Sequence, residues 1–222
     1  MTKDEIIQEL KKNANSKNVE GMKRFGIQGK NMLGITVAFL RKFAKKIPND
    51  HKLALELWKT GIHEARMLAS MVDELEKVTE KQMDSWVNDF DSWDICDGVC
   101  INLLGRTALV EKKIYEYAKS KKEFVRRTAF TLIVCLTVRH KELKDKDIIK
   151  YFDLIKEYSI DERNFVKKAV NWALRQIGKR DINLNKKALK VAREILKIDT
   201  KSARWIAHGA INELEKWKPK NI

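Results

Sequence analysis

Turn-forming residues are scarce in this sequence, which has two prolines and nine glycines among 222 residues. All-β proteins need many tight turns, and those turns draw on glycine and proline. The shortage therefore favours helices joined by short connections. Apolar runs are short as well, and none approaches the ~20 residues of a membrane-spanning helix. The first residues form an amphipathic helix start, unlike a signal peptide. We therefore expect a soluble cytoplasmic protein that binds no membrane.

Metal-ligating residues are also few. The three cysteines, Cys96, Cys100 and Cys135, are odd in number and lack CxxC spacing, which argues against a disulfide framework and against a zinc site. The four histidines are scattered without ligand spacing. Cys96 and Cys100 have no histidine nearby in sequence, so core packing is favoured over a nucleophilic role. We expect no metal and no cofactor.

Basic residues are abundant, with 46 Lys and Arg against 31 Asp and Glu, a net charge of +15 and a pI of about 9.6. One explanation is a lysine-rich composition that only keeps the surface soluble. The other is a polyanionic partner, because a positively charged protein binds the phosphate backbone of a nucleic acid whatever the base sequence.

Apolar residues recur at helical spacing along nearly the whole chain, and no stretch alternates as a half-buried strand does. The sequence therefore predicts an all-α fold. Thr2 is placed to cap the first helix, a short helix falls within 13–34, and another begins in 91–97 and runs to 104. The remaining helices are predicted over 37–47, 53–59, 63–75, 80–90, 112–118, 123–138, 146–155, 163–177, 185–196 and 201–217.

Two of these helices carry the same pattern, since 123–129 and 164–170 both place Phe-Val before a basic pair. The two copies are separated by about 40 residues, the period of the helical hairpins of HEAT and armadillo proteins. The units of such proteins stack into a curved α-solenoid. We predict one such domain over 1–222. Basic residues recurring at one phase of the inner helices would line its concave face; alternatively, they are ordinary solvated helix faces.

Trp93 and Asp97 stand four residues apart and so share one face of a helix. An aromatic ring beside a carboxylate can accept a flat cation. The alternative is that Trp93 is a core residue and Asp97 caps or pairs with an arginine of the next repeat. Asp97 lies among apolar residues, where an unpaired carboxylate is costly, and Arg127 and Trp172 lie at similar depth on later helices. These features favour a ligand-binding site at Trp93 and Asp97 over a purely structural role.

The chain resembles the DNA alkylation repair family, the HEAT-repeat alkylpurine DNA glycosylases of the AlkD type. The resemblance covers nearly the whole length. It is carried by the runs 24–27, 33–35, 40–45, 92–97, 124–129 and 165–175. The most specific part is the Trp-x-x-x-Asp element at 93–97, followed in order by an arginine and a tryptophan.

The resemblance implies an activity and a site. It implies a DNA glycosylase that excises cationic alkylated purines, of the 3-methyladenine and 7-methylguanine type, from duplex DNA. Asp97 would be the catalytic carboxylate, while Trp93, Arg127 and Trp172 would bind the substrate. Phe25 stands where the best-known members have a tyrosine. Further candidate DNA contacts are Phe25, Lys167, Lys168, Arg175, Arg180 and Arg204.

Three functions remain open from the sequence. The first is a monofunctional glycosylase for base excision repair, working as a monomer from the backbone side of DNA without a tight base pocket and associated with the nucleoid when bound. No lysine lies within 93–97, so no Schiff-base step is expected. The second is a non-catalytic protein that binds branched or damaged DNA with the same basic groove, since the family contains such relatives. The third is a HEAT scaffold for protein partners, against which the charge and the matched positions count.

Overall fold

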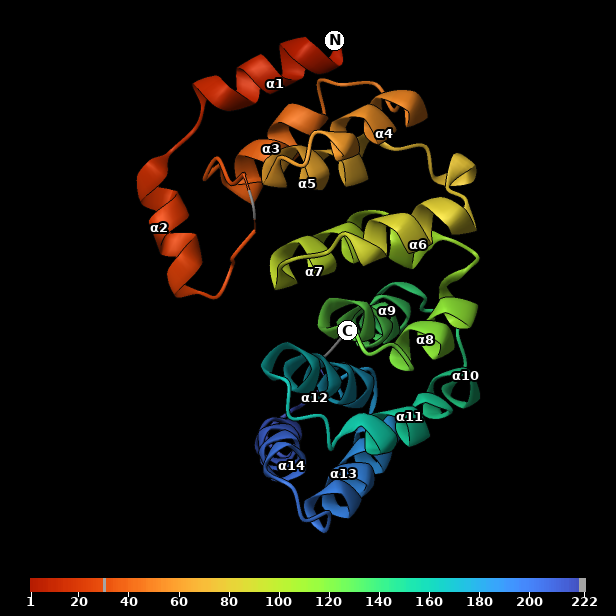
Figure 1. Cartoon of the computed structure of the whole chain (residues 1–222). Coiled ribbons are helices and arrows are strands. Elements are labelled where there is room, and N and C mark those ends of the chain that lie inside the picture. The colour runs from red at the N-terminus through yellow and green to blue at the C-terminus, as the bar shows by residue number, and fades with distance from the viewer. Residues whose placement is uncertain (30, 220–222) are drawn as a thin grey trace. The chain divides into compact units, whose positions relative to one another are not determined.

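A computed structural model describes residues 1–29 and 31–219, and within these ranges every regular element is helical (Figure 1). The predicted all-α fold is confirmed. The chain divides into two compact units, Met1–Leu109 and Val110–Ile222, called the first and second units below. The expectation of one domain over 1–222 stays a prediction.

Seven α-helices and two 3-10 turns form the described part of the first unit. Polar side chains cap many of these helices, because the first backbone N–H groups of a helix need acceptors. Thr2 caps the first helix in a capping box with Glu5, as expected from the sequence. In chain order the elements are α1 (Lys3–Lys12), α2 (Ser16–Arg24), α3 (Val37–Ala44), α4 (His51–Lys59), α5 (His63–Val72), η1 (Leu75–Lys77), α6 (Glu80–Asn88), α7 (Trp93–Asn102) and η2 (Leu104–Arg106).

Helix α5 lies at the centre of the first unit and packs against α3, α4 and α7. The core between α4 and α6 contains two stacked indoles, Trp58 and Trp86, whose ring centroids are 4.0 Å apart at an interplanar angle of 3°. The Trp58 Nε1 donates a hydrogen bond to Asp89 Oδ2 at 2.9 Å, which satisfies the polar end of an otherwise buried ring.

Long-range hydrogen bonds in the first unit recur at an interval of 31 residues. The pairs are Leu33 with Glu64, Trp58 with Asp89, and His63 with Asp94. Further side-chain hydrogen bonds of the unit span 22 to 35 residues, as between His51 and Asp73 or Asn102 and Met67. Contacts at such separations join neighbouring helical layers, as in stacked repeats.

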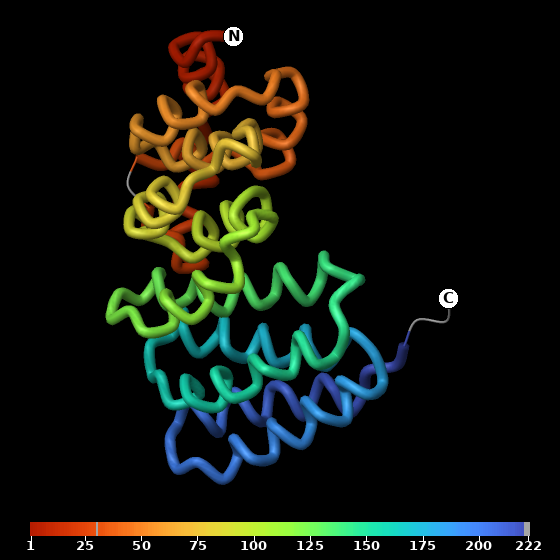
Figure 2. Tube along the Cα trace, turned by 90° about the vertical axis from the view of Figure 1, so that its right-hand side faces the viewer, coloured from red at the N-terminus to blue at the C-terminus, as the bar shows by residue number. Residues whose placement is uncertain are grey.

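The second unit consists of helical hairpins in successive layers, coloured green to blue in Figure 2. Helix α12 packs against both α9 and α14, so the second helices of consecutive hairpins lie side by side. The helices are α8 (Val110–Ala118), α9 (Glu123–Arg139), α10 (Asp145–Ile149), α11 (Tyr151–Tyr158), α12 (Asn164–Gly178), α13 (Ile182–Leu196) and α14 (Lys201–Leu214).

The predicted repeat is visible as direct contact in the second unit. The rings of Phe124 and Phe165, which are equivalent in the repeat, lie 5.4 Å apart between centroids. The Glu123 carboxylate accepts a hydrogen bond from the Phe165 N–H at 3.0 Å, and the Glu162 carboxylate accepts one from the Ser202 N–H at 3.1 Å. A glutamate of one hairpin thus caps the inner helix of the next hairpin, and the repeat prediction is confirmed.

The predicted helix boundaries differ from the structure in a few places. The helix expected over 37–47 ends earlier, at Ala44. The helix expected over 146–155 is two helices, α10 and α11, separated at Lys150. The helix expected over 201–217 ends at Leu214.

Candidate functional site

Trp93 is the first residue of α7, and Asp97 follows one helical turn later. Ser92 precedes the helix in an extended conformation, with φ −149° and ψ 158°, so the chain turns sharply into α7 at the indole. Both Trp93 and Asp97 are half-buried. They therefore lie on one face of α7, as the sequence predicts, with both side chains accessible to a ligand.

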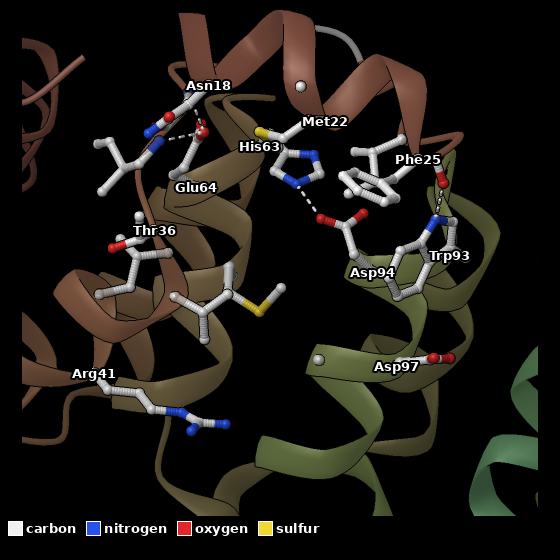
Figure 3. Close-up of a pocket in the computed structure, with 18 of the residues that line it drawn as sticks. Asn18, Met22, Phe25, Thr36, Arg41, His63, Glu64, Trp93, Asp94 and Asp97 are labelled. Atoms are coloured by element: carbon white, nitrogen blue, oxygen red, sulfur yellow. Dashed lines mark hydrogen bonds and ion pairs between the residues drawn. The ribbon is translucent and has the colours of Figure 1, made fainter. Parts of the chain in front are cut away.

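A cavity of about 630 Å³ lies against this face of α7 (Figure 3). Every residue that lines it belongs to the first unit, from α2, α3, α5, α7 and the loop before α3. Trp93 and Asp97 both line it, together with Asp94. Most of the remaining wall is apolar, including Met22, Ile27, Ile35, Leu40, Met67 and Ile101.

The Trp93 indole is held in place by the backbone of α2. Its Nε1 donates a hydrogen bond to the carbonyl oxygen of Phe25 at 3.1 Å, across 68 residues of sequence (Figure 3). Phe25 ends α2, and its side chain is 78% exposed although it is apolar. An aromatic ring fixed at the cavity and a second aromatic ring exposed beside it are suited to contact with a planar ligand.

A buried His63–Asp94 pair joins α5 to α7 beside the cavity. The His63 Nε2 lies 2.8 Å from Asp94 Oδ2, and the Ser92 hydroxyl donates to Asp94 Oδ1 at 2.6 Å. Burial lowers the pKa of His63, but the hydrogen bond and charge of Asp94 outweigh it, and the net pKa is raised above 6.5. For Asp94 burial raises the pKa, yet His63 and Ser92 bring the net value below 3.8. Sequence reasoning missed this pair.

We expect Asp94→Asn to lower the free energy of unfolding by about 2 kcal/mol near pH 5.5, the scale of a hydrogen bond between charged groups. A raised histidine pKa contributes stability that is full below 6.5 and lost as pH rises through the folded value. A lowered carboxyl pKa contributes stability present above 3.8 and lost as pH falls through the folded value. Urea unfolding at about pH 5.5 and about pH 8.5 should show the larger difference from wild type at the lower pH. An equal difference from wild type at the two pH values would contradict a stabilising charged pair of His63 and Asp94.

Glu64 forms the wall of the cavity opposite α7 through its hydrogen bonds to the loop before α3. Its carboxylate is 1% exposed and accepts from the backbone N–H groups of Leu33, Gly34 and Ile35 at 2.8, 2.7 and 3.2 Å. Gly34 has φ +77°, and a Cβ there would lie 2.1 Å from the Asn15 carbonyl oxygen. Only glycine fits this position, so the loop conformation depends on Gly34 and Glu64 together.

The other two predicted site residues lie in the second unit. Arg127, on α9, is 5% exposed and its Nη1 donates to the Phe165 carbonyl oxygen at 2.7 Å, which ties α9 to the start of α12. Trp172 is half-buried on α12. The cavity is lined by Trp93 and Asp97 alone of the four. That all four serve one site stays a prediction.

The family model of the DNA alkylation repair enzymes matches residues 6–214 of the sequence. The chain belongs to this family. A solved member of a family described as related to the HEAT-like repeat DNA glycosylases, with affinity for branched DNA structures, has a TM-score of 0.79 at 19% identity and covers 100% of this chain and 99% of its own. A designed armadillo repeat protein is a weaker match, with a TM-score of 0.38, 14% identity and coverage of 79% and 91%. No curated protein sequence matches.

In this DNA alkylation repair protein, both lysines predicted to contact DNA are accessible to a ligand, as is the exposed Phe25. The Lys167 Nζ lies 5.6 Å from the centroid of the Trp205 ring, which is 45% exposed. Lys168 is exposed, with its Nζ 5.9 Å from the Phe165 ring centroid. Both lysines stand near the N-terminal end of α12 in the second unit.

The three predicted arginine contacts are engaged within the protein. Arg175 pairs with Glu213, and Arg204, which is exposed, pairs with Asp199. Arg180 donates four hydrogen bonds, of 2.6 to 3.0 Å, to carbonyl oxygens in the last turn of α9 and in the segment between α9 and α10. Four of its five N–H donors are thereby used to hold the end of α9 and the segment after it. A contact of Arg180 with DNA stays a prediction.

Neither metal clusters nor membrane spans are found in the described part of the chain. Among residues 1–29 and 31–219, no three His, Cys, Asp or Glu side chains come together as a metal site would require. No helix in the same ranges is long and apolar enough to cross a bilayer. The three cysteines are all buried, which for Cys96 and Cys100 agrees with their predicted place in the core.

Proposed function

We propose that this protein is a monofunctional DNA glycosylase that releases cationic alkylated purines from duplex DNA. The observation that carries the proposal is that Trp93 and Asp97, one helical turn apart, line the same cavity of about 630 Å³. Membership of the DNA alkylation repair enzyme family supports DNA as the substrate, and the net charge of +15 supports binding to a polyanion.

The reaction requires little from the protein beyond charge and a positioned water. Alkylation at N3 of adenine or N7 of guanine makes the base a cation, so the base leaves as a neutral molecule when the N-glycosidic bond breaks. The electron pair of that bond goes to the base, and the sugar becomes an oxocarbenium-like cation. Water then adds to C1′ and loses a proton. A carboxylate beside the sugar stabilises the cation and orients the water; we assign this role to Asp97.

Aromatic rings complement the carboxylate. The Trp93 ring, fixed through its Nε1, offers its π-face to the cationic base or the deoxyribose. By resemblance, Trp172 contacts the lesion and Arg127 contacts a flanking phosphate. Lys167 and Lys168 are accessible enough to contact DNA phosphates. Each contact between a lysine and a phosphate makes the affinity for DNA fall more steeply as the salt concentration rises.

A lysine that the sequence-based interpretation did not consider also lines the cavity. Lys17 is exposed on α2. A lysine near a reactive sugar carbon can form a Schiff base with the abasic product, after which the DNA strand is cleaved. The proposed enzyme is monofunctional and uses water instead, so Lys17 would serve only as a positive charge near the DNA backbone.

The test is base release from duplex DNA methylated at purines, with borohydride present in a parallel reaction. We expect free 3-methyladenine or 7-methylguanine and an intact DNA strand that breaks only on later alkali treatment. A protein–DNA adduct trapped by borohydride would replace the monofunctional mechanism with a lyase mechanism through Lys17 or another lysine.

The second candidate is a non-catalytic protein that binds branched or damaged DNA. The solved protein with a TM-score of 0.79 comes from a family described as having affinity for branched DNA structures, which favours this alternative. It predicts tight gel shifts with four-way and three-way junctions and no base release from any alkylated duplex. Base release at a rate above the protein-free control would exclude it.

A further inference from the structure

We propose that the exposed ring of Trp205, in the second unit, binds the base of an unpaired nucleotide in DNA. The inference rests on DNA as the partner, which the proposed function and its alternative share, and it uses none of the four predicted site residues. Proteins that bind single-stranded nucleic acid commonly stack its bases on aromatic side chains that stand beside basic residues. Trp205 and the basic residues near it have this composition.

Trp205 is the one exposed tryptophan of the protein. All six tryptophans lie within the described residues, and the other five are buried or half-buried. Trp205 is 45% exposed, whereas Ala203, Ile206 and Ala207 on the opposite side of α14 are completely buried. Helix α14 therefore packs into the core without Trp205 and leaves a large aromatic ring available to a ligand.

The ring is carried by two helices that are fixed to each other. Helices α12 and α14 pack side by side (Figure 1). One turn after Lys167 on α12, the Asn171 side chain donates a hydrogen bond to the Ile206 carbonyl oxygen at 2.8 Å. The Lys167 Nζ lies over the Trp205 ring, 5.6 Å from its centroid, within the range of a cation–π contact. A ring held in place loses little conformational entropy when a ligand binds.

Positive charge is concentrated at the same helix ends. Four basic residues lie in the first turns of α12 and α14: Lys167, Lys168, Lys201 and Arg204. The nearby carboxylates are engaged within the protein: Asp161 with Arg126 and Arg163, Glu162 with the Ser202 N–H, and Asp199 with Arg204. The Arg204–Asp199 pair is exposed on both sides, and such a pair contributes little free energy. Arg204 can therefore exchange Asp199 for a phosphate at low cost.

This combination of side chains favours an unpaired nucleotide over two other occupants. Lysine is depleted in protein–protein interfaces, whereas two lysines lie directly beside Trp205 on α12. In a DNA duplex the flat faces of the bases are covered by their neighbours, and only the base edges are accessible in the grooves. The face of an indole ring can therefore stack on a base only where that base is unpaired.

Binding to a duplex interrupted by a short single-stranded gap of thymidines tests the proposal. We expect Trp205→Ala to weaken this binding on the order of 10-fold, the scale of one lost stack between a base and an aromatic ring. Binding to the uninterrupted duplex should stay at its wild-type value. Trp205→Phe keeps an aromatic ring and should retain most of the affinity for gapped DNA. The measurement is fluorescence anisotropy of labelled DNA at one fixed salt concentration.

Ile182→Ala is the matched control, because Ile182 is an apolar residue of the second unit that is 55% exposed on another helix. It should bind both DNAs as wild type does. Thermal unfolding of Trp205→Ala should match wild type, since the ring is outside the core. An equal loss of affinity for gapped and uninterrupted DNA, or no loss for either, would overturn the proposal.

Photochemical cross-linking locates the contact without relying on a substitution. The probe is the gapped duplex with iododeoxyuridine in place of one thymidine of the gap, which cross-links to a stacked aromatic side chain on irradiation. Trypsin cleaves after Arg204 and Lys216, and the peptide 205–216 contains Trp205 as its only aromatic residue. We expect the cross-link on this peptide. A cross-link found only on other peptides would contradict the proposal.

Base release measured in parallel separates this inference from the proposed function. Base release from methylated duplex DNA without a cross-link to 205–216 would leave the glycosylase standing and remove the stacking site. A cross-link to 205–216 without base release would keep the stacking site and assign it to a protein that binds branched or damaged DNA without cutting the glycosidic bond.

Discussion

Replacing Asp97 with asparagine is expected to slow base release from methylated duplex DNA by about 100-fold or more, the scale of one strong electrostatic contribution to a transition state. The substitution keeps the shape of the side chain and removes its negative charge. The oxocarbenium-like sugar then loses its stabilising negative charge, and the attacking water loses the carboxylate that orients it and accepts its proton. The measurement is single-turnover base release, wild type against Asp97→Asn, with alkali cleavage of the abasic product as readout.

The affinity for DNA distinguishes this role from a structural one. Removal of a negative charge near a polyanion should leave DNA binding unchanged or tighter, so only the chemical step should slow. Asp4→Asn is the matched control, because Asp4 is exposed on α1 and does not line the cavity. Unchanged base release by Asp97→Asn would transfer the catalytic role to another group.

Glu64→Gln is expected to lower the free energy of unfolding by about 2–4 kcal/mol, because a buried N–H group loses its acceptor and a charged hydrogen-bond partner is removed. The three groups that face Glu64 are all donors. A glutamine has one oxygen, so its amide NH₂ must face at least one of these N–H groups. The loop at Gly34 then loses its support, and with it the link from the Gly34 carbonyl oxygen to Asn18 at 2.9 Å.

Urea unfolding measures this effect, and base release reports its consequence for the cavity, since Gly34 and Ile35 line the wall. Glu76→Gln makes the same change of charge at an exposed position in the first unit and should leave both quantities at their wild-type values. If Glu64→Gln were as stable as Glu76→Gln, the three backbone hydrogen bonds would contribute nothing to the fold.

The helices and the repeat could be predicted because they depend on local periodicity. Apolar residues at helical spacing located nearly every helix, and the recurrence of Phe-Val at Phe124 and Phe165 anticipated the contact of these two rings. The face shared by Trp93 and Asp97 followed from a spacing of four residues on one helix. Each of these features can be recognised from a short stretch of the sequence.

The polar contacts of the cavity could not be predicted, because they join residues far apart in sequence. His63 and Asp94 lie 31 residues apart, and Glu64 lies about 30 residues from the N–H groups that it accepts from. A buried polar residue gives no local sign of its partner. The comparison of Phe124 with Phe165 matched only the second unit, so it gave no register for these pairs of the first unit.

The hydrogen bond from Trp93 to position 25 uses the carbonyl oxygen of the main chain. Any residue at that position presents the same acceptor, so the orientation of the indole is independent of which side chain stands there. The exposed Phe25 ring is therefore free to mutate without disturbing the α7 face. Position 25 is a place where substrate preference can diverge among descendants of this protein by single substitutions, while Trp93 and Asp97 keep their geometry.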